Sequence, residues 1–186
     1  MDKRVTIIFF ISILTVFPHL SDGHARMMEP PARNTMWRFG FNTTANYEDN
    51  QLFCGGIKVQ WQDNKGKCGI CGDAYDGPRI HETGGFMAKN ITTRKYPPGT
   101  QIDVLIELIA NHAGKFNFQI CWRNSTNILE TEECFEKVKL KNGSDTFNLS
   151  GKEPAGMFFV PIQLPANRTC DYCILRWDWK SGDFYF

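Results

Sequence analysis

The stretch QIDVLIELIANHAGKFNFQICW, residues 101–122, decides the fold class of this chain. Apolar residues take every second position on both sides of the segment 111–114, at Ile102, Val104, Ile106, Leu108, Phe116, Phe118, Ile120 and Trp122. β-Branched and aromatic residues at a period of two are typical of strands that bury one face. We therefore predict two antiparallel strands joined by a short connection, as in a β-hairpin.

The rest of the chain also favours strands and loops over helices. Residues 158–164, interrupted by Pro161, are expected to form an edge strand, because proline cannot donate a hydrogen bond to a neighbouring strand. Residues 172–179 are a further strand candidate. Proline pairs and glycine pairs fill the first third, which predicts long loops tied by Cys54, Cys68 and Cys71. The fold class that follows is all-β, an antiparallel β-sandwich with an elaborate loop region.

Residues 1–23 have the pattern of a secretory signal peptide. Lys3 and Arg4 precede an apolar run at 5–17, and Ser21 and Gly23 supply small residues before a cleavage point. The run is shorter than the roughly 20 residues that a membrane-spanning helix needs. We expect removal of 1–23, which leaves a secreted, extracellular chain whose residues 24–186 form a single domain and which is a monomer without a membrane anchor.

Seven cysteines lie after the leader, and cysteines of secreted proteins are usually paired in disulfides. Because the number is odd, one thiol is free, bonded to another chain, or partnered by a residue that this chain does not contain. The C-x-x-C units at 68–71 and 170–173 also suggest a zinc ribbon or a thioredoxin-like site. About a hundred residues separate the two units and no strand-helix-strand pattern surrounds either, so structural disulfides are favoured.

Composition limits the partners of the chain. The formal net charge is +1 and no basic block is present, which argues against nucleic acid as a partner. Six N-x-Ser/Thr sequons agree with passage through a glycosylating compartment, and they predict glycosylation at Asn42, Asn90, Asn124, Asn142, Asn148 and Asn167.

Leader removal would make His24 the first residue, and this points to a metal site. The free amine and the imidazole of His24 could bind one ion together, and Cu(II) favours nitrogen ligands in tetragonal geometry. A third nitrogen would come from His81 or His112. His112 is the better candidate because it lies between two predicted strands, which can aim its side chain, whereas the loop 78–85 offers His81 no such frame.

Several ordered motifs resemble the lytic polysaccharide monooxygenases of the invertebrate, chitin-active type. At the chain start these are His24, the run MEPPAR at 28–33 and the run MWRFGF at 36–41. The later ones are CGG at 54–56, CGICGD at 68–73, and the pair at 111–112 followed by Gly114, Phe116 and Phe118. The resemblance covers nearly all of the chain after the leader.

The resemblance implies a fibronectin- or immunoglobulin-like sandwich, a chitin-binding type-4 domain, with one copper ion held by His24 and His112 as metal ligands and catalytic residues. Such enzymes use an external electron donor and O2 or H2O2 to oxidise C1 or C4 of a sugar in crystalline chitin or cellulose. A non-catalytic carbohydrate-binding module of the same fold and an unrelated secreted interaction domain are the alternatives. Tyr47, among polar neighbours, is the most reasonable surface aromatic for stacking on a sugar ring.

The chain departs from the family pattern at its end. The family continues past the strand at 173–179 with more cysteines and a segment that brings a Tyr or Phe to the axial face of the copper. This sequence stops at Phe186, so the domain is expected to be truncated relative to the family, with activity in doubt. Phe184, Tyr185 and Phe186 are candidates for the axial position, but no motif aligns them with it.

Overall fold

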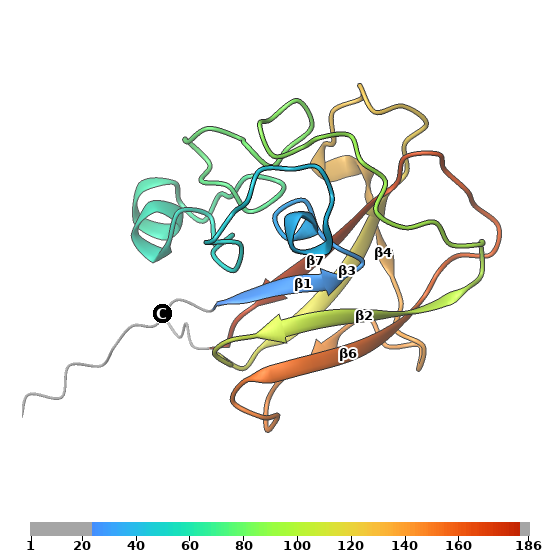
Figure 1. The fold of residues 1–186 in the computed structure, drawn as a ribbon. Coiled ribbons are helices and arrows are strands. Elements are labelled where there is room, and N and C mark those ends of the chain that lie inside the picture. The colour runs from blue at the N-terminus through green and yellow to red at the C-terminus, as the bar shows by residue number, and fades with distance from the viewer. Residues whose placement is uncertain (1–23, 183–186) are drawn as a thin grey trace, which may run out of the picture.

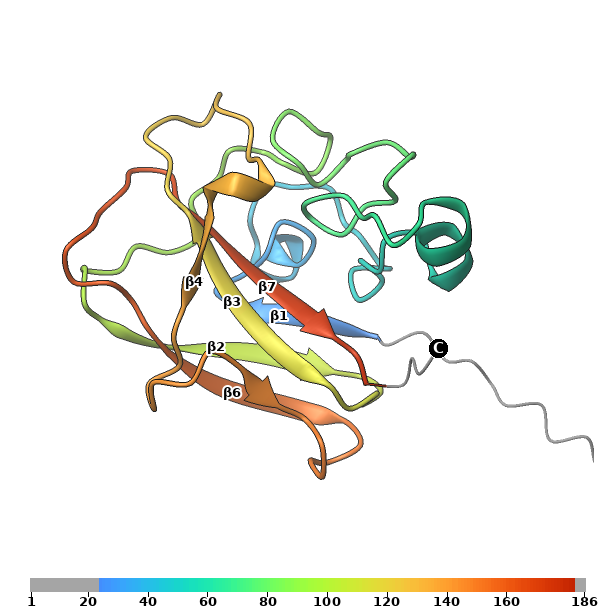
Figure 2. The same ribbon diagram turned by 180° about the vertical axis from the view of Figure 1, so that it is seen from behind.

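The computed structural model describes residues 24–182 of the chain and consists of two antiparallel sheets packed face to face (Figures 1 and 2). The first sheet has the order β1 (Ala25–Glu29), β2 (Gln101–Leu108), β6 (Gly156–Gln163). The second is built on β3 (Lys115–Cys121), which pairs with β4 (Phe135–Val138), β5 (Phe147–Asn148) and β7 (Ile174–Lys180). The helical turns are short: η1 (Met36–Phe39), η2 (Lys58–Asp63) and η3 (Glu132–Cys134). The predicted β-sandwich is confirmed.

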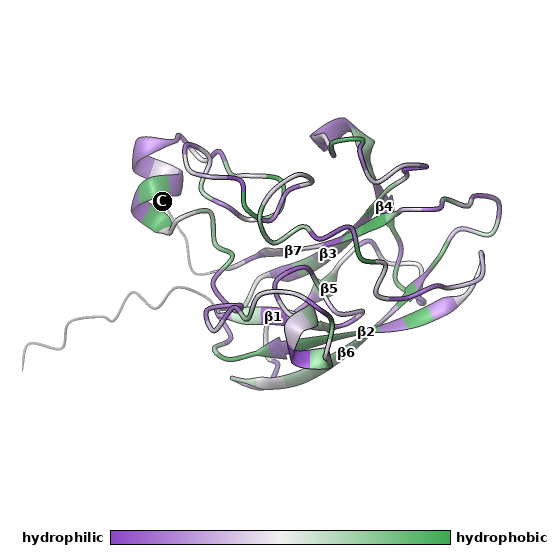
Figure 3. Ribbon diagram, turned by 45° about the horizontal axis from the view of Figure 1, so that its top comes forward, coloured by the Kyte–Doolittle hydropathy of each residue, from purple (hydrophilic) through white to green (hydrophobic). Residues whose placement is uncertain are grey.

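The core lies between the sheets and is formed by the alternating residues that the sequence pattern selected. Val104, Ile106 and Phe116 are fully buried, and the other predicted strand positions are buried beside them. Trp122, just past the end of β3, packs against this core while it remains partly exposed. Figure 3 shows polar and apolar residues alternating along β2 and a mostly polar colouring in the loops. The period of two therefore reports the buried face correctly.

The predicted hairpin, in contrast, is wrong. β2 pairs with β1 and β6, and β3 pairs with β4, β5 and β7, so the two strands belong to different sheets. Residues 109–114 cross from one layer to the other instead of folding the chain back within one sheet. A hairpin and such a crossing give the same alternation, because each strand buries one face in both arrangements.

The edge strand and the final strand are where the sequence predicts them. β6 forms the edge of the first sheet, and Pro161 lies opposite Asp103 of β2. β7 begins two residues later than predicted and pairs along its length with β3. Residues 30–100, which connect β1 to β2, are the long loops expected from the glycines and prolines, with η1 and η2 within them. No helix among the described residues has the length and apolar character needed to cross a membrane.

The disulfides correct one expectation about the loops. Bridges join Cys54 to Cys68, Cys121 to Cys134, and Cys170 to Cys173. Cys71 is the free thiol, so it does not tie the loops as predicted. Burial is the main cause that raises the pKa of Cys71 to about 12. Nearby carboxylates raise this pKa further, and the charge of Arg33 lowers it in part. The thiol therefore stays protonated at neutral pH, which makes it a poor nucleophile.

Candidate metal centre

His24 stands at the start of β1, on the edge of the first sheet. Its carbonyl oxygen accepts a hydrogen bond from the amide of Ile109 (2.8 Å), which extends the β1–β2 register by one residue beyond the pair Ala25 and Leu108. The imidazole of His24 is half-buried and meets the ring of Phe53 edge-on, with 6.3 Å between the ring centroids. His24 is thus held by its backbone on one side and contacts an aromatic ring on the other.

His112 lies in the crossing segment 109–114, whose backbone is fastened to β7 and to the residues after it. Gly182 donates an amide hydrogen bond to the carbonyl of His112 (2.8 Å), and the indole of Trp179 donates to the carbonyl of Ala113 (2.9 Å). The rings of His112 and Trp179 meet edge-on, with their centroids 6.2 Å apart. These contacts fix both the position of the segment and one face of the imidazole.

Two residues after His112 let the chain make this crossing. Ala113 and Gly114 both have left-handed backbone conformations, with φ of 52° and 78°. A Cβ atom at Gly114 would lie 1.9 Å from the carbonyl oxygen of Lys180, so a side chain there cannot be accommodated without moving the backbone. The close approach of this segment to β7 explains why glycine is needed at 114.

The two predicted ligands share one end of the sandwich. His24 lies opposite Ile109, and the three residues from Ile109 to His112 span at most about 11 Å of chain. Figures 1 and 2 show the start of β1, the connection between β2 and β3, and the end of β7 converging there. Both imidazoles are only half-buried, so this end is accessible from solvent. The arrangement places the two predicted ligand residues at the same end of the sandwich.

The donors at this end match copper better than the harder divalent ions. Two imidazoles, together with the amine that removal of 1–23 would expose, would offer nitrogen only, which suits Cu(II), whereas Mg²⁺ and Ca²⁺ require oxygen ligands. Among residues 24–182, no group of three His, Cys, Asp or Glu side chains could hold a metal ion. A site of two histidines and a terminal amine would need only two side chains, because its third donor is a backbone amine. Phe184, Tyr185 and Phe186, the axial candidates, lie outside the described residues.

His81 occupies a different environment. Its side chain is only 4% exposed, and Asp73 contacts it twice, through the ring Nδ1 (2.8 Å) and the backbone amide (2.9 Å). The carbonyl of His81 accepts a hydrogen bond from Arg33. The expectation of an unframed loop residue is therefore incorrect in one respect, since a buried carboxylate holds this histidine. A structural role in the loops accounts for it.

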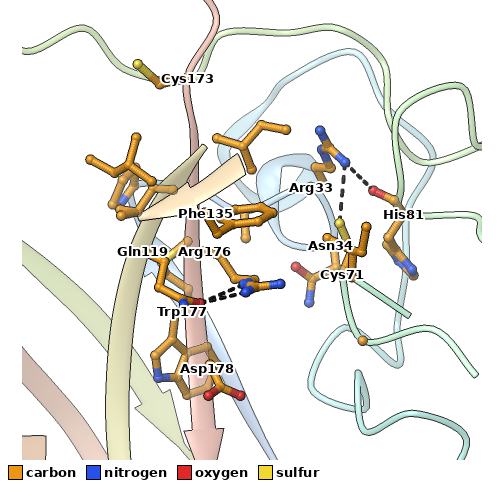
Figure 4. Close-up of a pocket in the computed structure, with 18 of the residues that line it drawn as sticks. Arg33, Asn34, Cys71, His81, Gln119, Phe135, Cys173, Arg176, Trp177 and Asp178 are labelled. Carbon is orange, nitrogen blue, oxygen red and sulfur yellow. Dashed lines mark hydrogen bonds between the residues drawn. The ribbon is translucent and has the colours of Figure 1, made fainter. Parts of the chain in front are cut away.

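A large groove lies along β7, and the candidate ligands do not line it. It has a volume of about 1440 Å³ and runs between the loops and the second sheet, and neither His24 nor His112 lines it. Figure 4 shows Arg176 bonded to Gln119 on one wall, and Arg33 with Cys71 and His81 on the other. Arg33 and Arg176 also form ion pairs, with Glu130 and Glu132. His24 and His112, both half-buried, thus lie outside this groove, at the end of the sandwich.

Two buried carboxylates organise the loops, and the sequence did not reveal either of them. Asp49 binds Arg26 and Arg38, and Glu130 binds Arg33 and Arg123. Neither carboxylate lies in a periodic segment, so the local sequence resembles that of an exposed loop. Their arginine partners lie between 7 and 97 residues away in the sequence. A single sequence gives no means of deciding which arginine pairs with which carboxylate.

Glu130 predicts a measurable pH dependence of stability. Burial would raise the pKa of Glu130, but a hydrogen bond from Thr83 and the charge of Arg33 outweigh it, and the pKa falls to about 2. A carboxyl whose pKa is lower in the folded state stabilises the fold fully at pH values above its pKa in the unfolded chain, about 4.3. This contribution is lost as the pH falls towards the pKa in the folded state. We expect the free energy of unfolding, measured with urea, to decline from about pH 4.5 downwards. The decline should be shallower in Glu130→Gln, and an identical slope in both proteins would contradict the assignment.

Comparison with known proteins agrees with this geometry. Residues 24–186 match the family described as lytic polysaccharide mono-oxygenase, cellulose-degrading. Among solved structures, the chain is similar to a lytic polysaccharide monooxygenase AA15 from Thermobia domestica in the Cu(I) state, with 41% sequence identity and a TM-score of 0.83. That similarity covers 86% of this chain and 84% of the other. No curated protein matches the chain.

The family match begins at His24, the residue directly after the expected leader, and the structural likeness covers 86% of the chain. The resemblance drawn from the motifs at the chain start and around His112 is thereby confirmed. This chain belongs to the lytic polysaccharide monooxygenase family.

Proposed function

We propose that the mature protein begins at His24 and is a secreted, copper-dependent monooxygenase that cleaves glycosidic bonds of crystalline chitin. The observation that carries this proposal is the register of β1 on β2. It sets His24 opposite Ile109, at the end of the sandwich where the crossing segment presents His112. Removal of 1–23 would add a free amine to the same end.

In this proposal three nitrogens of two residues hold the copper ion. The amine and Nδ1 of His24 would bind the ion together, and the imidazole of His112 would supply the third nitrogen. When bound, copper supplies the one-electron chemistry by which an external electron donor and O2 or H2O2 oxidise C1 or C4 of the sugar. The protein contributes the geometry, because Phe53 and Trp179 each contact one imidazole edge-on and limit its rotation.

The position of the site supports an insoluble polysaccharide as substrate. A chain packed in a crystal cannot enter a deep pocket, but a half-buried pair of ligands at the end of a rigid sandwich can approach it. Tyr47 is 81% exposed, and its ring packs edge-on against Trp37 with 5.3 Å between the ring centroids. It lies in the loop that leads to Asn50, whose carbonyl accepts a hydrogen bond from the amide of Ala25. A sugar ring could stack on this supported aromatic face.

Extracellular location is proposed from the leader and from features of the surface. The asparagines of all six sequons are exposed, which is required for glycosylation, and six of the seven cysteines are in disulfides. Disulfides persist in the oxidising compartments through which secreted proteins pass. Mass spectrometry of the secreted protein should therefore find His24 as its first residue and glycans at the sequons.

The test of function combines spectroscopy and product analysis on the mature protein. We expect one equivalent of Cu(II) to give an electron paramagnetic resonance spectrum with hyperfine structure from several nitrogens. With copper, ascorbate and H2O2, chitin should release oxidised oligosaccharides, and cellulose is assayed in parallel to decide between the two substrates. Tight binding of the polysaccharide without oxidised products would show that the protein is a carbohydrate-binding module and not an enzyme. The absence of a nitrogen-rich copper signal would refute the proposed site.

A further inference from the structure

The carboxylate of Asp49 is the most enclosed charge near the start of β1. Its side chain has no exposed surface, and it accepts hydrogen bonds from Arg26 Nη1 (2.7 Å), Arg38 Nη2 (3.1 Å) and Arg38 Nε. Arg26 is two residues from His24 and is held from the other side by Glu107 of β2 (2.7 Å). The guanidinium of Arg26 thus joins the loop that carries Asp49 to the sheet that carries His24.

The backbone around Asp49 makes a second connection to the chain start. The carbonyl of Asn50 accepts a hydrogen bond from the amide of Ala25 (3.2 Å), the residue directly after His24. The carbonyl of Asp49 accepts one from the side-chain amide of Asn34, which is itself buried. Segment 49–53 therefore lies against the outer edge of β1, and Phe53 at its end contacts the ring of His24.

We propose that Asp49 is a positioning residue for the amino-terminal half of the metal centre, an inference that rests on the proposed function. A chain terminus frays unless its backbone is tied down, and a ligand that must be ordered on binding lowers the affinity for the metal. Asp49 ties β1 down at the two residues after His24 and orders the segment that supplies Phe53. His24 is thereby held in place before the metal arrives.

Glu130 provides a matched control, because it is the same kind of group in another place. Each carboxylate is almost completely buried and bridges two arginines, and the amide substitutions Asp49→Asn and Glu130→Gln each leave two arginines short of a charge partner. Both variants should lose stability for this reason. None of the contacts described for Glu130 involves β1 or segment 49–53. A positioning role makes the two variants differ in metal binding, and Arg38→Gln below separates this role from the field of the lost charge.

The test measures Cu(II) affinity of the mature proteins by competition with a chelator, together with thermal unfolding and the electron paramagnetic resonance spectrum. We expect Asp49→Asn to bind copper about 10- to 100-fold more weakly than the wild type, as is typical when a residue that orients a ligand is removed. Its spectrum should show a broader distribution of sites. Glu130→Gln should unfold at a lower temperature than the wild type yet keep wild-type affinity and spectrum.

Arg38→Gln distinguishes a positioning role of Asp49 from a purely electrostatic effect. It also replaces Asp49→Asn as the test variant if Asp49→Asn does not fold. Removal of a positive charge near a cation would strengthen copper binding through the field alone, whereas loss of the clamp weakens it. Weaker binding in Arg38→Gln and faster exchange of the Ala25 amide support the inference. Wild-type affinity in Asp49→Asn, or stronger binding in Arg38→Gln, overturns it. A wild-type protein that binds no copper would instead overturn the proposed function.

Discussion

A chain that keeps Gly23 in front of His24 is expected to lose both copper affinity and oxidative activity almost completely. The extra residue converts the amine of His24 into an amide, whose nitrogen no longer offers a lone pair, and the chelate ring is lost with it. The free amine then belongs to Gly23, one residue further from the ring of His24, so the proposed chelate of amine and Nδ1 cannot form. The loss should exceed the roughly 10- to 100-fold decrease typical for an outer-shell substitution, as measured by isothermal titration calorimetry with Cu(II).

The same molecule provides the control for this experiment. Trimming Gly23 with an aminopeptidase, in the folded protein, should restore copper binding and the release of oxidised oligosaccharides without any change of sequence elsewhere. Thermal unfolding in the absence of metal should be alike before and after trimming. Equal copper affinity in the extended and trimmed forms would show that the terminal amine is not a ligand.

His112→Ala is expected to have the second largest effect. The substitution removes one of the three proposed nitrogens, while the backbone contacts of His112 with Gly182 and of Ala113 with Trp179 remain possible, since both use carbonyl oxygens. We expect a decrease in Cu(II) affinity beyond the roughly 10- to 100-fold range of outer-shell changes, with a simpler nitrogen hyperfine pattern. Activity on chitin should fall below detection at copper concentrations that saturate the wild type.

His81→Ala is the matched histidine substitution. It removes the ring contact with Asp73 from the buried loops and should lower the unfolding temperature, but the copper affinity should remain that of the wild type. Equal losses of affinity in the two variants would reassign the third nitrogen. A loss in His81→Ala alone would show that the crossing segment does not provide a ligand.

The strands and the buried face were predictable from the sequence, because burial of one face imposes a period of two that is visible in a single chain. The pattern at 102–108 and 116–122 identifies the core correctly. It could not assign these strands to sheets, since pairing depends on which distant strand lies alongside. The crossing through Ala113 and Gly114 depends on the close approach of Gly114 to the carbonyl oxygen of Lys180, which the sequence alone does not reveal.

The two histidines proposed as ligands were accessible to sequence analysis because each stands next to a recognisable boundary, a cleavage point or a pair of strands. The residues that support them were not. Asp49, Phe53 and Trp179 act through contacts with His24, Arg26 and His112 that span between 23 and 67 residues of sequence. Even the carboxylate with no exposed surface lies in a polar run, where local composition indicates a solvated loop.

The crossing between the two layers has a thermodynamic consequence. His24 belongs to the layer of β1, β2 and β6, while His112 is fastened to the end of the layer that contains β7. An ion shared by the two imidazoles would be a non-covalent cross-link between the layers, formed only when both are in register. Because a ligand that binds only the native state adds RT ln(1 + [L]/Kd) to its stability, loading with copper would raise the melting temperature of the whole sandwich. Conversely, any strain that separates the layers would weaken the binding of copper.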